Sequence, residues 1–136
     1  MRLLLDTNIV LDVLLERKEF LPNSKQAIIK AMDKGDKLFL SCSAVTDIYY
    51  IIRKNVGSKE IAYYSLKDLA IILNFADVNE KCILNAIESK ISDFEDAVVD
   101  AVAINTDIDY IITRNIEHFK NATTKILTPE AYLQLC

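Results

Sequence analysis

The sequence contains no tryptophan, one histidine, two glycines and two prolines among its 136 residues. So few chain-breaking residues favour helices, with short strands formed by apolar runs. The three cysteines are widely spaced, which excludes a Cys-rich zinc site and predicts reduced thiols rather than disulfides. The composition is 51% hydrophobic and shows no repeat or low-complexity tract, so we expect a single domain over residues 1–136.

An excess of charge of one sign is also largely missing. The chain has 16 basic and 20 acidic residues and a net charge of −4, which excludes a general polyanion-binding surface. If a metal site used the four aspartates Asp6, Asp47, Asp93 and Asp96, the remaining acidic residues would equal the basic ones in number. A surface of that kind would not strongly repel a phosphate chain.

A long hydrophobic run is missing at the N-terminus. The opening "MRLLLDTNIVLDVLL" is interrupted by Asp6, Asn8 and Asp12 before it reaches the length of a signal peptide or membrane span. We therefore expect a cytoplasmic protein with no membrane segment.

The order of apolar and capped segments predicts an α/β fold. Apolar runs predict strands at 2–5, 37–42, 75–78, 109–113 and 125–128. Helices are predicted between them, with Thr7 or Asn8, Asn23 or Ser24, Ser43, Ser58, Asn79, and Ser92 or Asp93 as caps, and with Pro129 opening the last one. This alternation predicts a short central parallel sheet with helices on both faces. Ligands bind such sheets beyond the carboxyl ends of the strands.

The segment "SDFEDAVVDAVA", residues 92–103, places four acids in an otherwise apolar helix. Helical geometry puts Asp93, Asp96 and Asp100 within roughly 60° of one another and turns Glu95 to the opposite side. The flanking alanines and valines indicate that this helix is mostly buried. We therefore expect the three aspartates to line a cleft in which a cation compensates their charge.

Three further aspartates have ordinary explanations when each is taken alone. Asp6 ends the first strand and resembles a turn or cap residue, and Asp47 lies near the favourable N-terminus of its helix. Asp12 lies on an otherwise apolar helix and needs a polar partner. We expect Asp12 to support the site through hydrogen bonds, with a purely structural role as the alternative.

Clustered aspartates without a cluster of softer ligands favour a hard divalent cation, Mg²⁺ or Mn²⁺. The one histidine, His118, is expected to be a surface or core residue. Since no serine, cysteine or histidine nucleophile is indicated, this pattern points to a metal-activated water that attacks a phosphate ester.

Four segments in order resemble the PIN-domain ribonucleases, including the VapC-type toxins of toxin–antitoxin pairs. They are "LLLDTNIVLDVL", "SCSAVTDIYYIIRK", "SDFEDAVVDAVA" and "DYIITRNIEHF", and the resemblance covers nearly the whole chain. It implies a PIN-like fold and Mg²⁺- or Mn²⁺-dependent cleavage of RNA. It also implies a homodimer and a small antitoxin that blocks the site.

Carried over by position, Asp6, Asp47 and Asp96 correspond to the family's catalytic, metal-binding acids. Asp47 stands where the family more often has glutamate, so its carboxylate is one methylene shorter. Asn115 replaces a fourth acid of many members, and Asp93 lies one turn before Asp96, where it is able to compensate. Whether Asp93 or Asn115 contacts the metal stays open at this point.

Other residues are predicted to assist. Asn8 and Thr113 follow strands and are expected to position ligands or phosphate through hydrogen bonds, with helix capping as the alternative. Four basic residues are expected to bind RNA phosphates: Arg53, Lys54, Lys59 and Arg114.

Two other phosphoryl-transfer classes fit less well. A haloacid-dehalogenase phosphatase needs a second acid two residues after the first, where this chain has Asn8, and a receiver domain needs a lysine after a central strand that is absent here. The stronger alternative is a PIN-like module that binds RNA or protein with weakened catalysis, because Asp47 and Asn115 depart from the full acidic set.

Overall fold

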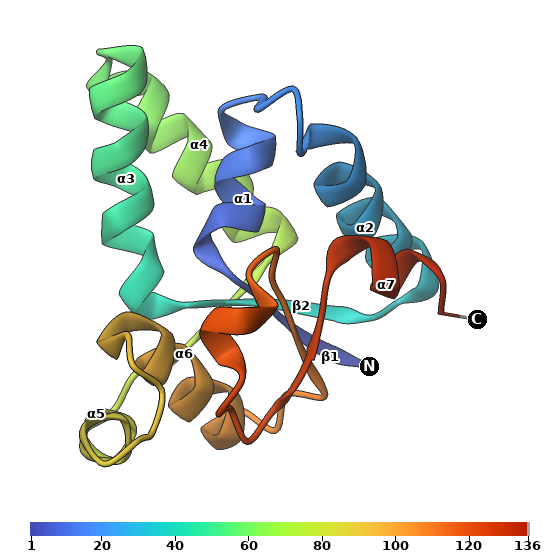
Figure 1. Ribbon diagram of the computed structural model, residues 1–136. Helices are drawn as coiled ribbons and strands as arrows, with labels where there is room; N and C mark the ends of the chain where they lie inside the picture. Colours follow the sequence, from blue (N-terminus) through green and yellow to red (C-terminus); the bar gives the residue numbers. More distant parts are fainter. Residues whose placement is uncertain (136) are drawn as a thin grey trace.

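The computed structural model describes residues 1–135 and contains one five-stranded sheet, all of whose strands are parallel (Figure 1). The strands are β1 (Arg2–Leu5), β2 (Lys37–Ser41), β3 (Asn74–Ala76), β4 (Tyr110–Ile112) and β5 (Lys125–Leu127). Their order across the sheet is β3-β2-β1-β4-β5. All five predicted strands are therefore confirmed, as is the short parallel sheet.

Helices cover both faces of the sheet. They are α1 (Thr7–Leu14), α2 (Leu21–Lys34), α3 (Cys42–Val56), α4 (Lys59–Ile72), α5 (Glu80–Ile87), α6 (Phe94–Asn105) and α7 (Pro129–Leu133), with a 3₁₀ turn η1 (Ile116–Phe119). One core joins the sheet to α1, α2, α3, α4 and α7, and a second core joins it to α5, α6 and η1. Figure 1 shows α5 and α6 on the opposite side of the strands from α1 and α2.

The central strand β1 contributes to both cores. Successive strand side chains point to opposite faces, so Leu3 and Leu5 pack into the first core while Leu4 packs into the second. Leu3 and Leu4 are both completely buried. This double burial explains why the strand reads as an uninterrupted apolar run.

Two of the predicted helix caps are wrong by one or two residues. Asp6 rather than Thr7 or Asn8 caps α1, and Ser41 rather than Ser43 caps α3, with the Ser41 hydroxyl accepting from the Ser43 amide. In both cases the last residue of the strand, or the one directly after it, is already the cap. No loop residue separates strand from helix, so the first polar side chain satisfies the helix amides.

The start of α2 also differs from the prediction. The helix begins at Leu21 with Pro22 in its first turn and has no side-chain cap, so neither Asn23 nor Ser24 serves as one. Proline lacks the amide hydrogen that a cap would bind, which makes a side-chain cap less necessary. Ser24 is completely buried instead.

The other predicted helix starts are confirmed, including Pro129 as the first residue of α7. Ser58, Asn79 and Asp93 cap α4, α5 and α6 through their side chains. Gly35 and Gly57 end α2 and α3 with φ values of 78° and 74°, in the left-handed region that glycine adopts without a steric penalty.

The sheet topology brings the segments that follow β1, β2 and β4 to one edge of the sheet. From β1 the chain proceeds to β2 and β3 on one side, whereas β4 and β5 lie on the other side, so the connections diverge at β1. Parallel α/β sheets bind ligands at the carboxyl edge of such a switch point. The amide of Asp6 donates to the carbonyl of Ile112 at 2.9 Å, which fixes Asp6 beside the end of β4.

The structure also describes two of the three cysteines and the apolar character of the helices. Cys42 is exposed, Cys82 is buried and both are free thiols, whereas Cys136 lies outside the described residues. Within residues 1–135, no helix has the length and apolar character needed to cross a membrane.

Asp100 corrects the expectation that Asp93, Asp96 and Asp100 line one cleft together. Its side chain is buried, and its two carboxylate oxygens accept hydrogen bonds from the amides of Thr123 and Thr124, each at 3.1 Å. These amides precede β5, so Asp100 anchors the loop that leads into the edge strand. A protein contact, rather than a cation, compensates this carboxylate.

We expect Asp100→Ala to lower the free energy of unfolding by about 2 kcal/mol, because it leaves the Thr123 and Thr124 amides without acceptors. Urea denaturation measures this change. Glu88→Ala, at an exposed position on the same side of the sheet, should alter stability by less than about 0.5 kcal/mol. Equal stability of the two variants would contradict the anchoring role.

Candidate functional site

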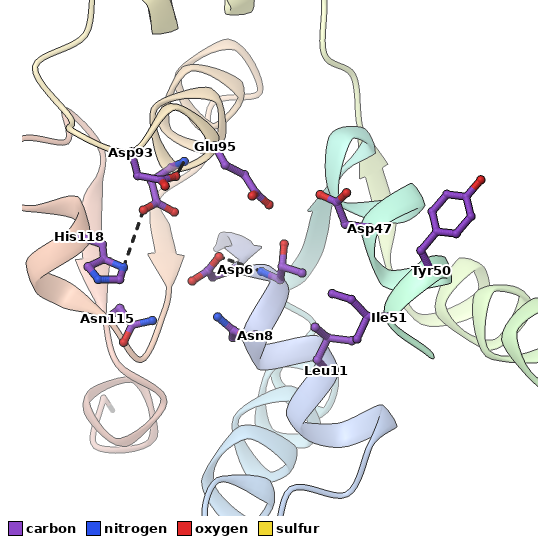
Figure 2. A pocket seen from close by; sticks show the side chains of 12 residues that line it. Asp6, Asn8, Leu11, Asp47, Tyr50, Ile51, Asp93, Glu95, Asn115 and His118 are labelled. Atoms are coloured by element: carbon purple, nitrogen blue, oxygen red, sulfur yellow. Dashed lines mark hydrogen bonds and ion pairs between the residues drawn. The ribbon is translucent and has the colours of Figure 1, made fainter. Parts of the chain in front are cut away.

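A cleft of about 460 Å³ lies at the carboxyl edge of the sheet, between α1 and α3 on one side and α6 and η1 on the other (Figure 2). The cleft brings together all four aspartates that the sequence analysis selected as metal ligands, with Asn8 and Asn115, although they are far apart in the chain. Its lining residues are Asp6, Thr7, Asn8, Leu11, Asp47, Tyr50, Ile51, Asp93, Glu95, Asp96, Asn115 and His118.

Asp6 lies at the base of the cleft, and both of its carboxylate oxygens have fixed partners. One oxygen accepts from the Thr7 amide at 2.9 Å, and the other accepts from the Thr113 hydroxyl at 2.8 Å. Thr113 follows β4 and also accepts from the Asn115 amide at 3.1 Å. Burial raises the pKa of Asp6, and the hydrogen bonds from Thr113 and Thr7 oppose that rise. The carboxylate is therefore held in one orientation.

Asp93 and Asp96 lie on the opposite wall, at the start of α6. The Asp93 carboxylate accepts from the Asp96 amide at 3.0 Å and so caps the helix. Burial, followed by the negative charges of Asp93 and Asp6, raises the pKa of Asp96 to about 6. The Asp96 side chain is 15% exposed, so it is both desolvated and open to the cleft.

Glu95 is a site residue that the sequence analysis assigned to the wrong face. Figure 2 shows its side chain extending into the cleft, between the Asp93–Asp96 wall and Asp47. Burial raises the pKa of Glu95, and the neighbouring Asp47 raises it further. Asp93 is the cap of α6, as one of the two predicted caps, and helical geometry still turns Glu95 about 100° away from Asp96. The cleft spans a wide enough arc to receive both Glu95 and Asp96.

His118 is the second residue that the sequence analysis missed. It lies in η1, lines the cleft, and places its ring Nδ1 3.8 Å from a carboxylate oxygen of Asp96. Its position in the fourth motif, three residues after Asn115, was the only signal in the sequence. His118 lies in a short turn rather than a regular helix, so the periodicity of apolar residues does not predict the direction of its side chain.

Asp12 lies outside the cleft and is completely buried. One of its oxygens accepts from the Ser24 hydroxyl and from Nε of Arg114, both at 2.9 Å. Arg17 completes the cluster at 3.4 Å, and the Arg114 guanidinium stacks 3.6 Å from the ring centre of Phe20. The Asp12–Arg114 pair therefore ties α1 to the segment that carries Thr113 and Asn115.

Three of the four basic residues predicted to bind RNA phosphates lie away from the cleft lining and are exposed. Arg53 and Lys54 occupy the last turn of α3, and Lys59 begins α4. Arg53 donates to the hydroxyl of Tyr49 at 3.3 Å, and the Lys59 ammonium lies 5.9 Å from the ring centre of Tyr63. The fourth, Arg114, forms an ion pair with Asp12.

The donor set of the cleft fits a hard divalent cation. Five carboxylates line it, and no lysine or arginine does so among the described residues. Within residues 1–135, no three acidic, histidine or cysteine side chains already surround one point as a complete metal cage. Mg²⁺ does not require such a cage, because it retains several waters and uses one or two carboxylates together with substrate phosphate.

The family model of the PIN domain matches residues 2–117 of this chain. The chain belongs to the PIN-domain family. This match includes every residue that the sequence analysis assigned to the site, and it confirms the resemblance seen in the four motifs. No curated protein matches this PIN-domain chain significantly by sequence.

Solved structures show the same fold. VapBC2 of Rickettsia felis, bound to a DNA fragment from its promoter, matches with a TM-score of 0.73 and 20% identity over 94% of this chain and 98% of that chain. VapBC-1 of nontypeable Haemophilus influenzae matches with a TM-score of 0.70 and 19% identity over 96% and 99% of the two chains. The sarcin-ricin-loop-cleaving toxin VapC20 of Mycobacterium tuberculosis matches with a TM-score of 0.64 and 14% identity over 80% and 86%.

We expect Asp96→Asn to stabilise the metal-free PIN domain at pH 7 by about 1 kcal/mol and to have little effect at pH 4. The pKa of Asp96 rises from 3.8 to about 6 on folding. Between these values the folded protein binds more protons than the unfolded chain, so stability falls as pH rises through this window and the cost is complete above it. Asparagine carries no charge at any of these pH values, so Asp96→Asn removes the loss of stability that comes from ionising Asp96.

Thermal unfolding in EDTA at both pH values measures the difference between wild type and Asp96→Asn. The exposed Asp68→Asn, on α4 and outside the cleft, is the matched control and should show no such pH dependence. A destabilising effect of Asp96→Asn at pH 7 would contradict the repulsion argued for this wall.

Proposed function

We propose that this PIN-domain protein is a metal-dependent endoribonuclease and acts as a VapC-like toxin. The supporting observation is the cleft in which Asp6 and Asp96, from distant segments of the chain, face one another without a lysine or arginine among the described lining residues. Family membership makes nuclease chemistry the natural use of such a cleft. The rise of the Asp96 pKa toward neutrality indicates that a cation is needed to keep its carboxylate charged at low cost.

We propose Asp6, Asp47, Asp93 and Asp96 as the residues that hold Mg²⁺ or Mn²⁺, with Asp6, Asp47 and Asp96 as the catalytic set. A bound ion of this kind lowers the pKa of a water molecule and neutralises charge on the scissile phosphate. Asp93 lines the cleft with a carboxylate already committed to capping α6, and Asn115 lines it with a neutral amide. Of these two, Asp93 is the ligand that we favour because it carries charge.

Neighbouring residues keep this arrangement in place. Thr113 holds one Asp6 oxygen and the Thr7 amide holds the other, so Asp6 does not need to reorganise. Asn8 and Asn115 present amide groups to the cleft and are placed to donate hydrogen bonds to a phosphate oxygen. Asp12 supports the site indirectly through Arg114, which precedes Asn115 in the chain. We therefore assign Arg114 a positioning role, in addition to any contact with RNA.

Arg53, Lys54 and Lys59 remain the proposed phosphate contacts outside the cleft. They cluster where α3 ends and α4 begins, and Tyr50 and Ile51, one turn before them, line the cleft. RNA that leaves the acidic centre along α3 would reach this basic turn. Contacts of this type give affinity without sequence preference.

The structural relatives guide the proposed biology. The VapBC structures from Rickettsia felis and Haemophilus influenzae share the fold, and so does a toxin–antitoxin complex from Klebsiella pneumoniae. We propose that this protein likewise binds a small antitoxin, forms a homodimer and acts in the cytoplasm as a single domain. The cleaved sarcin-ricin loop of the VapC20 toxin makes a structured RNA loop a reasonable substrate class.

The second candidate function is a PIN-like module that binds RNA or protein with weakened catalysis. It is favoured by the short Asp47 side chain, by the neutral Asn115, and by the lack of three ligand side chains already gathered around one point in the described part of the chain. Such a module would bind its partner in the presence of a chelator.

We expect antitoxin-free protein with Mn²⁺ or Mg²⁺ to cleave a mixed RNA pool into fragments that bear 5′-phosphates. Asp6→Asn should reduce the rate at least about 100-fold, and EDTA should abolish cleavage. Glu88→Gln, an exposed charge change outside the cleft, should cleave like wild type. RNA binding without cleavage, unaffected by EDTA, would favour the binding module.

In an Asp6→Asn background, we expect the triple change Arg53→Gln, Lys54→Gln and Lys59→Gln to weaken binding of single-stranded RNA. The slope of log K against log salt should become shallower by about 0.7 for each phosphate that the protein no longer neutralises. The control changes three exposed lysines elsewhere, Lys25, Lys81 and Lys125, to glutamine. Equal effects of the two triple variants would show that only net charge matters.

A further inference from the structure

We propose that His118 is a nitrogen ligand of the ion in the acidic cleft and makes the site prefer first-row transition ions such as Mn²⁺ to Mg²⁺. This inference rests on the proposed function, because it concerns the same ion. It adds a residue that the acidic motifs do not include, and it assigns a metal preference.

The distance between His118 and Asp96 supports a shared ion rather than a direct bond. Nδ1 of His118 lies 3.8 Å from the nearer Asp96 oxygen, which is beyond hydrogen-bond range. Two donor atoms that each lie about 2.1 Å from one ion are separated by about 3.0 Å at a right angle and about 4.2 Å when opposite. The observed separation falls within this interval, so an ion fits between the two atoms without a large movement of either side chain.

The ring of His118 is available for a ligand. It is 63% exposed, and in residues 1–135 the only polar side-chain contact of the ring is the one with Asp96. Figure 2 shows the imidazole on the same side of the cleft as Asn115, directed toward the Asp93–Asp96 wall. η1 and α6 therefore bring one nitrogen and one oxygen donor to the same place, with Asp6 across the cleft.

The chemistry of the donor atoms predicts that His118 changes the relative affinity of the cleft for Mn²⁺ and Mg²⁺. The other donors of the cleft are carboxylate, amide and hydroxyl groups, whose oxygens suit Mg²⁺ and Mn²⁺ alike. Mg²⁺ gains little from an imidazole, whereas affinity for nitrogen ligands rises from Mn²⁺ through Fe²⁺ and Co²⁺. Loss of His118 should therefore weaken binding of a transition ion while binding of Mg²⁺ stays nearly constant.

A different role of the same residue gives the opposite result. If His118 served only as a positive partner of Asp96, it would compete with any cation for that carboxylate. Its replacement would then strengthen the binding of Mn²⁺ and Mg²⁺ together. The direction of the change therefore distinguishes a ligand from a counter-charge.

The chain offers an unusually clean spectroscopic test, because His118 is its only histidine. Mn²⁺ bound to tag-free wild-type protein is studied by pulsed electron paramagnetic resonance. We expect nuclear modulation from a directly bound imidazole ¹⁴N, and its loss in His118→Asn. Glu117→Gln, on the same 3₁₀ turn, exposed and outside the cleft lining, is the matched control and should retain the modulation.

Competition titrations complete the test. We expect His118→Asn to weaken Mn²⁺ binding about tenfold and Mg²⁺ binding less than twofold, with Glu117→Gln equal to wild type for both ions. Circular dichroism shows whether each variant is folded, and Asp96→Asn should weaken the binding of both ions. Tighter binding of both ions by His118→Asn overturns the proposal.

The outcomes separate this inference from the proposed function. If Mn²⁺ binds wild type, depends on Asp96 and shows no imidazole modulation, His118 is not a ligand, yet the metal site and the nuclease proposal stand. If Mn²⁺ does not bind the cleft at all, both proposals fail. Modulation that persists in His118→Asn assigns the nitrogen to another group and also overturns the inference.

Discussion

Repulsion among carboxylates is the constraint on which the cleft depends. The fold brings Asp6, Asp47 and the start of α6 to one edge of the sheet and supplies no lysine or arginine there among the described residues. Burial raises the pKa of Asp6, Glu95 and Asp96, and neighbouring carboxylates raise the pKa of Glu95 and Asp96 further. Such a cluster lowers the stability of the protein, and the cost is offset when a cation occupies the centre.

The rest of the molecule makes this arrangement rigid. Two cores, one on each face of the sheet, fix β1 and β4, and the Asp6 amide extends their ladder by one residue. The buried Asp12–Arg114 pair then ties α1 to the loop after β4. Removing Arg114 would leave the completely buried Asp12 carboxylate with only the longer contact to Arg17 as charge compensation, so this pair links the stability of the fold to the geometry of the cleft.

The sequence alone was sufficient for the parallel sheet, for the position of Asp6 at the end of β1, and for the convergence of Asp6, Asp47 and Asp96. The sheet and the places of Asp6 and Asp47 follow from apolar runs and from the rule that parallel strands end at one edge. Asp96 was added to them by the acidic stripe of its helix and by the resemblance to the PIN-domain motifs. The place of Glu95 in the cleft was not predictable, because the width of the cleft depends on how α1, α3 and α6 pack around it. Asp100 was misjudged, and the place of His118 beside Asp96 was not foreseen, since the partners of both residues are fixed only by tertiary packing.

A crystal structure of the protein grown with Mn²⁺, with anomalous scattering recorded at the manganese edge, tests the central claim most directly. The account expects an anomalous peak in the cleft within coordination distance of both the Asp6 and Asp96 carboxylates. An empty cleft at saturating Mn²⁺, with these two carboxylates unchanged, would contradict it. In that case the acidic cleft would need a positively charged partner instead of a metal ion.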